Sequence, residues 1–190
     1  MGEISVTTVY FEQPGPENTD RTLEIAKKRA DELGIKDILV ATTRGETGVK
    51  ASRSFKGFNL IAVTHSTGFA RPNFQELIPD NRKEIEGNGG RVLTCQHAFG
   101  GVGRAVRNKL GTYQLEELIA YTLRTFGQGM KVAVEIVLMA IDAGLVPTDR
   151  EVISIGGTNS GADTAVLVQP ANAAAFFDLR VKEILCKPRF

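Results

Sequence analysis

The chain has 190 residues, of which 42% are hydrophobic and 24% are charged, a composition typical of an ordinary globular protein. Its formal net charge of +1 gives no electrostatic case for binding nucleic acid or an anionic membrane surface. Cys95 and Cys186 lie far apart without a Cys-x-x-Cys pattern, so neither a disulfide framework nor a zinc site is expected. The length favours one domain over residues 1–190.

We expect a cytoplasmic protein without a membrane segment. Residues 1–5 do not combine a basic region with a following apolar run, so no signal peptide is predicted. The longest apolar stretch, Val132 to Ile141, is interrupted by Glu135 and is shorter than the roughly 18 residues that a membrane helix needs.

The first half of the chain alternates between predicted strands and predicted helices. Runs of β-branched and aromatic residues indicate the strands, and apolar residues at three- and four-residue steps indicate the helices. Asn18 or Thr19 is expected to cap the first helix, and Gly34 follows its end. The strands are expected at residues 4–11, 38–41 and 60–64. The first helix is expected from the spacing of Leu23, Ala26, Ala30 and Leu33, and the second at residues 46–55.

The second half is less regular. A short polar helix at 80–86 precedes a strand at 91–95, and a further helix opens after the segment 96–104. Two helical segments follow, separated by Gly127-Gln128-Gly129. The remaining elements are predicted as helices at 114–126 and 131–142, strands at 151–155 and 165–169, and an edge strand at 181–187.

Alternation of strands and helices indicates parallel strands joined by right-handed crossovers. In such sheets, ligands bind beyond the carboxyl ends of the strands. Three segments rich in glycine and hydroxyl groups follow predicted strands in this sequence: residues 42–48, 65–72 and 156–164. We therefore expect these three segments to line one shared site.

The first of these segments has the composition of an anion cradle. Four apolar residues end in Thr42-Thr43-Arg44-Gly45, and a predicted helix then begins at Glu46. Free backbone N–H groups and the positive end of the helix dipole favour an anion at such a place. The hydroxyl groups of Thr42, Thr43 and Thr47 are candidate additional ligands, although a plain structural turn is the alternative.

Two other glycine patterns do not fit nucleotide-binding motifs. Gly101 and Gly103 match the start of a dinucleotide fingerprint, but Val106 occupies the place of its third glycine. Gly156 and Gly161 have the spacing of a P-loop, but Ala162-Asp163 replaces the required Lys-Ser/Thr pair. Neither a Rossmann NAD site nor an NTPase is therefore predicted.

His65, His97 and Lys131 are the candidate chemical groups. Each histidine follows a predicted strand, where an imidazole either binds a ligand, transfers a proton or forms only a structural hydrogen bond. Lys131 lies near a helix start and is a candidate anion ligand or amine nucleophile, with a solvated side chain as the alternative. Glu135 is expected either to be paired or to face a cleft. No His-x-x-x-His pattern indicates a metal.

The apolar residues of the same helix leave the oligomeric state open. Val134, Val137, Leu138 and Ile141 form a stripe that fits either the core or a subunit interface. A homo-oligomer is consequently one of two interpretations of this stripe.

These motifs resemble the C-terminal domain of pyruvate kinase. Residues 18–20, 38–47 and 60–64 are similar to the opening of that domain, where a threonine- and serine-rich loop holds a phosphate of the allosteric sugar bisphosphate. Residues 149–157 and 160–164 are similar to its final glycine-rich effector loop. The segments 97–104 and 127–131 depart from the kinase domain.

With these differing segments, the chain resembles a group of stand-alone archaeal and bacterial proteins that have a pyruvate kinase C-terminal-like domain. The resemblance rests on residues 67–69, 129–131, 161–164 and the tail 182–189, and it spans the chain. It implies a three-layer α/β/α fold with a mixed, mostly parallel sheet, and FMN as a bound ligand. Residues 1–190 have no counterpart of the kinase's catalytic barrel, so phosphoryl transfer from phosphoenolpyruvate is not expected.

The expected ligand-binding residues come from the three strand-end segments and their neighbours. The phosphate of FMN is assigned to Thr42, Thr43, Gly45 and Thr47, whereas Glu46 fits poorly beside a dianion and is expected to bind a ribityl hydroxyl or to cap the helix. The complete predicted set is Asn18, Thr42, Thr43, Arg44, Gly45, Glu46, Thr47, Thr64, His65, Thr67, Gly68, Phe69, His97, Lys131, Gly156, Gly157, Thr158, Gly161, Ala162, Asp163 and Thr164.

The sequence leaves three functional interpretations. The first is an FMN-binding flavoprotein, with an oxidoreductase as one form of it, since flavin chemistry belongs to the cofactor. The second is a non-catalytic module that senses a phosphorylated small molecule. The third is an enzyme acting on a phosphorylated substrate with His97 or Lys131 as base. No residue pattern identifies a reaction or a substrate.

Overall fold

Seven strands form one mixed sheet in the computed structural model, which describes residues 2–189. The strand order is β1-β7-β6-β5-β2-β3-β4. Four neighbouring pairs are parallel, and only β6 runs antiparallel to its two neighbours. The strands are β1 Val9–Phe11, β2 Asp37–Ala41, β3 Asn59–Val63, β4 Arg91–Leu93, β5 Val152–Gly156, β6 Thr164–Gln169 and β7 Arg180–Pro188.

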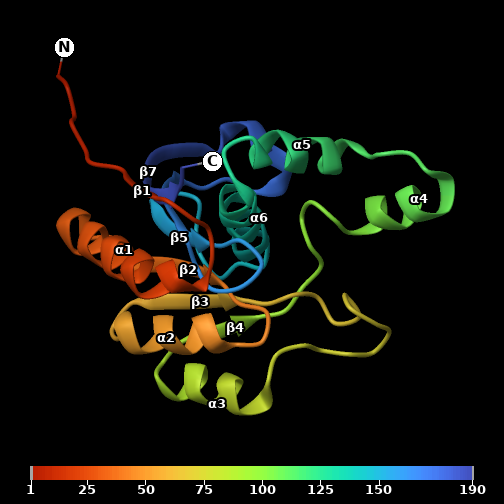
Figure 1. Ribbon diagram of the computed structural model, residues 1–190, viewed down its shortest axis with the longest axis horizontal. Coiled ribbons are helices and arrows are strands. Elements are labelled where there is room, and N and C mark those ends of the chain that lie inside the picture. Colours follow the sequence, from red (N-terminus) through yellow and green to blue (C-terminus); the bar gives the residue numbers. More distant parts are fainter. Residues whose placement is uncertain (1, 190) are drawn as a thin grey trace.

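Helices cover both faces of the sheet, which gives three layers (Figure 1). One apolar cluster joins one face to α1 and α2, and a second joins the other face to α5 and α6. The α-helices are α1 Thr19–Leu33, α2 Glu46–Ser54, α3 Pro79–Gly87, α4 Val102–Leu110, α5 Leu115–Arg124 and α6 Gln128–Asp142, and the 3-10 helices are η1 Pro16–Asn18 and η2 Ala173–Asp178.

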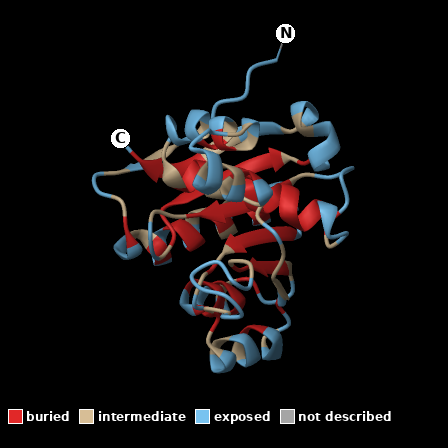
Figure 2. Ribbon diagram, turned by 90° about the vertical axis from the view of Figure 1, so that its right-hand side faces the viewer, coloured by how far each residue is buried: buried red, intermediate tan, exposed pale blue. Residues whose placement is uncertain are grey.

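The central strands are buried because they have helices on both sides. Every residue of β5 is buried, and so are the first four residues of β2 and the last four of β3. Strands in this position are apolar on both faces, which explains why their sequences are continuous apolar runs rather than alternating patterns. Figure 2 shows this buried layer in the middle of the molecule. The predicted three-layer α/β/α class is confirmed.

The sheet brings four strand ends to one edge. β2 pairs in parallel with β3 and with β5, and β3 pairs in parallel with β4, so the carboxyl ends of all four point the same way. β6 is antiparallel to β5, and the pair Gly156 and Thr164 joins the end of one to the start of the other. Most of the sequence-predicted ligand residues lie along this edge.

Two predictions about the outer strands were wrong. The C-terminal strand β7 is not an edge strand, because it lies between β1 and β6. The first strand was predicted from residue 4, but pairing with β7 begins only at Val9, which is opposite Cys186. A β-rich composition makes residues 4–8 compatible with a strand, but a strand also needs a partner, and local sequence does not specify one.

The start of α1 also differs from the prediction. Asn18 occupies the capping position without a side-chain capping bond, and its amide donates to the carbonyl of Gln13 at 2.8 Å instead. The hydroxyl of Thr19 donates to the carbonyl of Pro16 at 2.7 Å. The short helix η1 directly before α1 supplies the preceding turn, so no side-chain cap is needed.

Within residues 2–189, no helix combines the length and the apolar composition that crossing a membrane requires. The same residues contain no group of three or more histidine, cysteine, aspartate or glutamate side chains placed to hold a metal ion.

Candidate functional site

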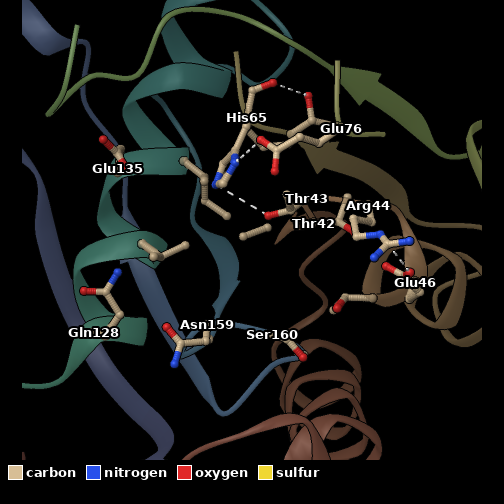
Figure 3. Close-up of a pocket in the computed structure, with 18 of the residues that line it drawn as sticks. Thr42, Thr43, Arg44, Glu46, His65, Glu76, Gln128, Glu135, Asn159 and Ser160 are labelled. Atoms are coloured by element: carbon tan, nitrogen blue, oxygen red, sulfur yellow. Dashed lines mark hydrogen bonds and ion pairs between the residues drawn. The ribbon is translucent and has the colours of Figure 1, made fainter. Parts of the chain in front are cut away.

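A cavity of about 810 Å³ opens at the carboxyl edge of the sheet (Figure 3). Its walls come from the loops after β2, β3, β4 and β5 and from the helices α2 and α6. Small-molecule sites typically measure roughly 300–1,000 Å³, and open α/β sheets place them at this edge. The cavity is therefore the candidate ligand site.

The loop after β2 is shaped by Gly45. This glycine precedes α2 with a φ of 108°, and a Cβ atom there would lie 2.4 Å from the Cβ of Asn81. The hydroxyl of Thr42 accepts the N–H of Gly48 at 3.2 Å and is thereby used within the loop. Among residues 2–189, the N–H groups of Glu46 and Thr47 have no hydrogen-bond partner. These two groups are free to bind an anion at the start of α2.

Glu46 does not cap this helix. Its carboxylate lies 3.8 Å from the guanidinium of Arg44, and both side chains are about two-thirds exposed, at 64% and 67%. An exposed ion pair of this kind leaves both groups free to move. Glu46 can therefore turn away from an anion at the helix start.

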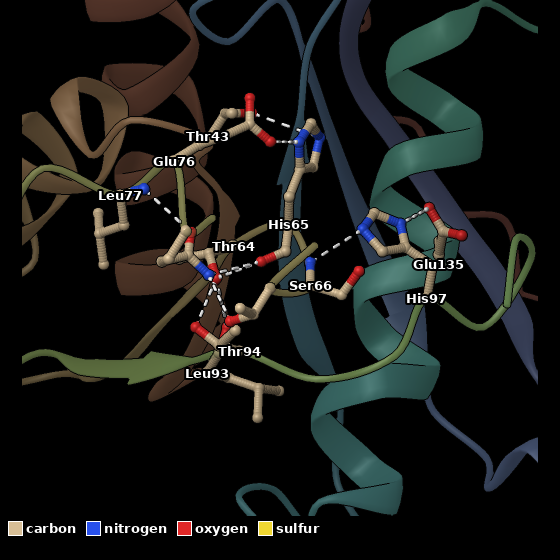
Figure 4. Close-up of polar contacts among 12 residues, drawn as sticks. Thr43, Thr64, His65, Ser66, Glu76, Leu77, Leu93, Thr94, His97 and Glu135 are labelled. Carbon is tan, nitrogen blue, oxygen red and sulfur yellow. Dashed lines mark hydrogen bonds and ion pairs between the residues drawn. The ribbon is translucent and has the colours of Figure 1, made fainter. Parts of the chain in front are cut away.

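Thr43, His65 and Glu76 form a chain of polar contacts on the cavity wall (Figures 3 and 4). Nδ1 of His65 lies 2.8 Å from the carboxylate of Glu76, and Nε2 lies 3.4 Å from the hydroxyl of Thr43. A carboxylate only accepts hydrogen bonds, so Nδ1 carries a proton and Nε2 faces Thr43. The imidazole is thus oriented between a carboxylate and a hydroxyl.

The second histidine belongs to a more buried group. Nε2 of His97 accepts the N–H of Ser66 at 3.4 Å, and Nδ1 lies 3.6 Å from the carboxylate of Glu135 (Figure 4). That carboxylate also accepts hydrogen bonds from the ammonium of Lys131, one turn earlier on α6, and from the N–H of Phe99 at 2.9 Å. Glu135 therefore joins the loop after β4 to α6.

Burial and pairing act in opposite directions on these ionisable groups. Burial by itself raises the pKa of Glu135, but the hydrogen bond from His97 and the charge of Lys131 outweigh it and lower that pKa to about 2. Burial lowers the pKa of Lys131, and the charge of Glu135 offsets part of the effect. Glu135 is consequently ionised at neutral pH.

The ring of Phe69 packs against both histidines. The ring of Phe69 lies 4.0 Å from that of His65 and 5.0 Å from that of His97, measured between centroids. The guanidinium of Arg104 lies 4.5 Å from the centroid of the same phenylalanine. The two imidazoles are 5.3 Å apart. This end of the cavity therefore presents flat rings, whereas the α2 end presents N–H and hydroxyl groups.

The glycine-rich loop after β5 is held by a buried aspartate. One oxygen of Asp163 accepts the N–H of Gly15 at 3.3 Å and that of Thr158 at 3.1 Å, and the other accepts the hydroxyl of Thr164 at 2.8 Å. A Cβ at Gly161 would lie 2.4 Å from the Cα of Pro16. The loop is packed against the segment before α1, and its polar groups serve that packing.

The cavity gathers twelve of the predicted ligand residues. They come from the loop after β2, the loop after β3, the loop after β4, α6 and the loop after β5. These residues are Thr42, Thr43, Arg44, Glu46, Thr47, Thr64, His65, Phe69, His97, Lys131, Gly157 and Gly161.

The other predicted residues do not line it. Thr67 and Gly68 line an adjoining pocket of about 600 Å³ with Phe69 and His97. Gly45 shapes the loop from behind, and Asn18 bonds within the segment before α1. The remaining members, which support the loop after β5 rather than face the cavity, are Gly156, Thr158, Ala162, Asp163 and Thr164.

Several lining residues were not predicted from sequence. Glu76 lies in an irregular loop, and Arg104, Arg124 and Gln128 lie at helix ends far along the chain. Gln128 lies in the Gly127-Gln128-Gly129 break and Arg104 in the segment 97–104, but neither pattern identifies a ligand-binding side chain. Glu135 was singled out because it interrupts an apolar stripe, and the two alternatives considered for it both hold, since it is ion-paired and also lines the cavity.

The charge of the lining favours an anion. The lining residues include five cationic side chains and three carboxylates, in a chain whose net charge is only +1. A cleft lined mainly by one sign of charge concentrates ligands of the opposite sign. The cations are Arg44, Lys50, Arg104, Arg124 and Lys131, and the carboxylates are Glu46, Glu76 and Glu135.

Comparison with known proteins identifies the family. Residues 20–168 match the family model described as pyruvate kinase, alpha/beta domain, which covers most of the chain. The protein therefore belongs to the pyruvate kinase alpha/beta domain family, as the resemblance predicted.

Two solved structures are similar over part of their length. A Cryptosporidium parvum pyruvate kinase in complex with ADP is 14% identical, covering 77% of this chain and 22% of the kinase, with a TM-score of 0.38. An O-ureido-L-serine synthase is 17% identical, covering 66% of this chain and 48% of the synthase, with a TM-score of 0.31. The chain thus spans about a fifth of the first protein and about half of the second.

Proposed function

We propose that the protein binds FMN in this cavity, with the phosphate at the start of α2 and the isoalloxazine toward the histidines. The observation that supports this most is the division of the cavity into two ends. One end carries free N–H groups and threonine hydroxyls, and the other carries flat rings. FMN has the matching division, with a phosphate at one end and a flat ring system at the other.

The α2 end suits a phosphate monoester. Within the described residues 2–189, the N–H groups of Glu46 and Thr47 have no hydrogen-bond partner, and Thr43 and Thr47 line the cavity. A phosphate needs several donors and a positive potential, and the cationic excess of the lining supplies the latter. Arg44 is exposed and free to turn toward the phosphate.

The opposite end suits a flat, partly polar ring. Phe69 and His97 offer ring surfaces beyond His65, whose Nε2 meets the Thr43 hydroxyl where the two parts of the cavity join. The backbone of Gly157 and Gly161 also lies on the cavity wall, without side chains to obstruct a ligand. Flat ligands bind to such surfaces through ring stacking and a few directed hydrogen bonds. Bound FMN would supply hydride or electron transfer, and the residues of this chain would position it and exclude water.

The test is the binding of FMN compared with riboflavin, which lacks the phosphate. We expect the freshly purified protein to absorb visible light as flavins do, and mass spectrometry to identify FMN in the denatured supernatant. At a concentration of 100 times its Kd, FMN should raise the melting temperature by roughly 5–10 °C. Riboflavin at the same concentration should raise it far less.

A matched pair of threonine variants tests the location. Thr47→Val removes a hydroxyl from the α2 end, and losing a hydrogen bond to a charged group should weaken FMN binding roughly 10-fold or more. Thr122→Val alters an exposed helical threonine on α5 and should leave the affinity unchanged. Equal effects of FMN and riboflavin, or no effect of either, would contradict the proposal.

The same measurements separate FMN from a phosphorylated metabolite. A sugar phosphate without a ring system would use the α2 end and leave the ring surfaces uncovered. If such a compound raises the melting temperature and FMN does not, the protein is a phosphometabolite-binding module rather than a flavoprotein.

A further inference from the structure

Three side chains from separate segments meet at the cavity wall in the order hydroxyl, imidazole, carboxylate. Thr43 follows β2, His65 follows β3, and Glu76 lies in the loop before α3. The hydroxyl is 3.4 Å from Nε2 of the imidazole, and the carboxylate is 2.8 Å from Nδ1 (Figure 4). Glu76 thereby fixes which imidazole nitrogen is left to accept a proton from Thr43.

Thr43 differs from its neighbour in how its hydroxyl is used. The hydroxyl of Thr42 accepts the N–H of Gly48, so it serves the structure of the loop. Among residues 2–189, the hydroxyl of Thr43 has a hydrogen-bond contact only with Nε2 of His65. A hydroxyl beside an oriented base, with no structural partner, has the arrangement of an activated nucleophile.

We propose that Thr43, His65 and Glu76 form a catalytic triad that transfers the phosphoryl group of a phosphate monoester. The proposal rests on the phosphate-binding part of the function proposed above, and it does not require that the monoester be FMN. A phosphoryl group fits better than an acyl group, because the lining carries an excess of cations and free N–H groups beside Thr43.

The reaction has two steps. In the first, Oγ of Thr43 attacks phosphorus, Nε2 of His65 takes the hydroxyl proton, and the ester P–O bond breaks. The leaving alcohol takes that proton, and a phosphothreonine remains. In the second, Nε2 takes a proton from water, which attacks phosphorus, and Oγ of Thr43 leaves and takes the proton. The sum is hydrolysis of the monoester to an alcohol and phosphate.

The roles of the three residues differ. Thr43 and His65 contact the reacting atoms and are the catalytic residues. Within residues 2–189, the carboxylate of Glu76 forms a hydrogen bond only with the imidazole, and Glu76 is a positioning residue that keeps the proton on Nδ1. The side chains of His65 and Glu76 are 30% and 21% exposed, so substitution at either position leaves no fully buried group unpaired.

The experiment is hydrolysis of p-nitrophenyl phosphate by the full chain, together with mass spectrometry for phosphate on Thr43. We expect release of nitrophenol by the wild-type protein and a phosphorylated peptide that contains Thr43. Thr43→Val and His65→Gln should lower kcat roughly 100-fold or more, since general-base catalysis contributes at least that much. Thr43→Ser should retain both the turnover and the label, because it keeps the hydroxyl.

Glu76→Gln tests positioning separately. It should lower kcat while leaving KM unchanged, because the substrate does not contact this carboxylate. Thr122→Val on α5 and Glu84→Gln on α3 are the matched controls, since Thr122 is exposed, Glu84 is half-exposed and paired with Arg53, and both lie outside the cavity, so both variants should keep the wild-type rate. Melting temperatures of all variants show whether each one is folded.

Each result decides the proposal. A wild-type protein that neither hydrolyses the monoester nor becomes phosphorylated would overturn the triad, and so would unchanged turnover in folded Thr43→Val. Stabilisation by FMN without any turnover would leave the proposed FMN binding intact and reject the triad. Turnover with a label on Thr43, but no stabilisation by FMN, would support the triad and reject FMN.

Discussion

The two histidines of the cavity have similar partners and different surroundings. Each faces a carboxylate through Nδ1, but the side chain of His65 is 30% exposed and that of His97 is 12% exposed. Glu76 pairs with His65, whereas Glu135 also accepts hydrogen bonds from the ammonium of Lys131 and the N–H of Phe99. A carboxylate with one partner is available to orient an imidazole. One with three partners stabilises the fold.

The largest difference between the two pairs should appear in stability. Glu135→Gln leaves the buried ammonium of Lys131 without its counter-charge, which costs roughly 3–5 kcal/mol, or roughly 6–20 °C in melting temperature for a chain of this length. Glu76→Gln breaks a partly exposed contact and should cost about 1 kcal/mol or less. Thermal unfolding of both variants, followed by circular dichroism, measures the difference. Equal losses would mean that the two carboxylates have the same role.

Low pH should also reveal the larger contribution of the Glu135 pair to stability. The pKa of Glu135 is lowered to about 2 from its ordinary value of 4.5, so its contribution to stability is complete above about pH 4.5 and is lost as the pH falls toward 2. The groups that face it are Lys131, His97 and the N–H of Phe99. The free energy of unfolding, measured from pH 7 to pH 2.5, should therefore fall more steeply in the wild-type protein than in Glu135→Gln. Parallel curves would contradict this assignment.

The smallest effect concerns the accessibility of the two rings. Diethyl pyrocarbonate should modify His65 faster than His97, since His65 is more exposed. Phe69→Ala should accelerate both modifications and should destabilise the protein by about 1 kcal/mol, the usual value of such ring contacts. Peptide mass spectrometry over a time course gives both rates. A faster reaction at His97 in the wild-type protein would reverse the proposed order of accessibility.

The buried part of the sheet was predictable from sequence because its signal is local. Residues 38–41 and 60–63 are apolar runs between turn-forming segments, and each corresponds to a buried strand. The convergence of three strand-end segments was predictable as well, since parallel strands place their carboxyl ends at one edge. Thr43, His65 and Gly157 were grouped in this way and do line one cavity.

The polar partners were less predictable because they depend on three-dimensional proximity. Glu76 reaches His65 from a loop without regular structure, and nothing in the local sequence distinguishes it from Glu84 or Glu86. Asp163 was grouped with ligand residues because it lies in a glycine-rich loop, yet its oxygens accept bonds from Gly15, Thr158 and Thr164. Composition identifies a loop at a site, but it does not separate the residues that bind a ligand from those that support the loop.

The pairing of β1 with β7 has a consequence for folding during synthesis. Val9 is opposite Cys186 and Phe11 is opposite Pro188, so β1 pairs with a strand that is synthesised much later. The core around β2, β3 and β5 can form earlier, whereas β1 lacks its partner until β7 has been made. Because such distant contacts form slowly, a nascent chain stalled before residue 180 should expose β1 to proteases and chaperones.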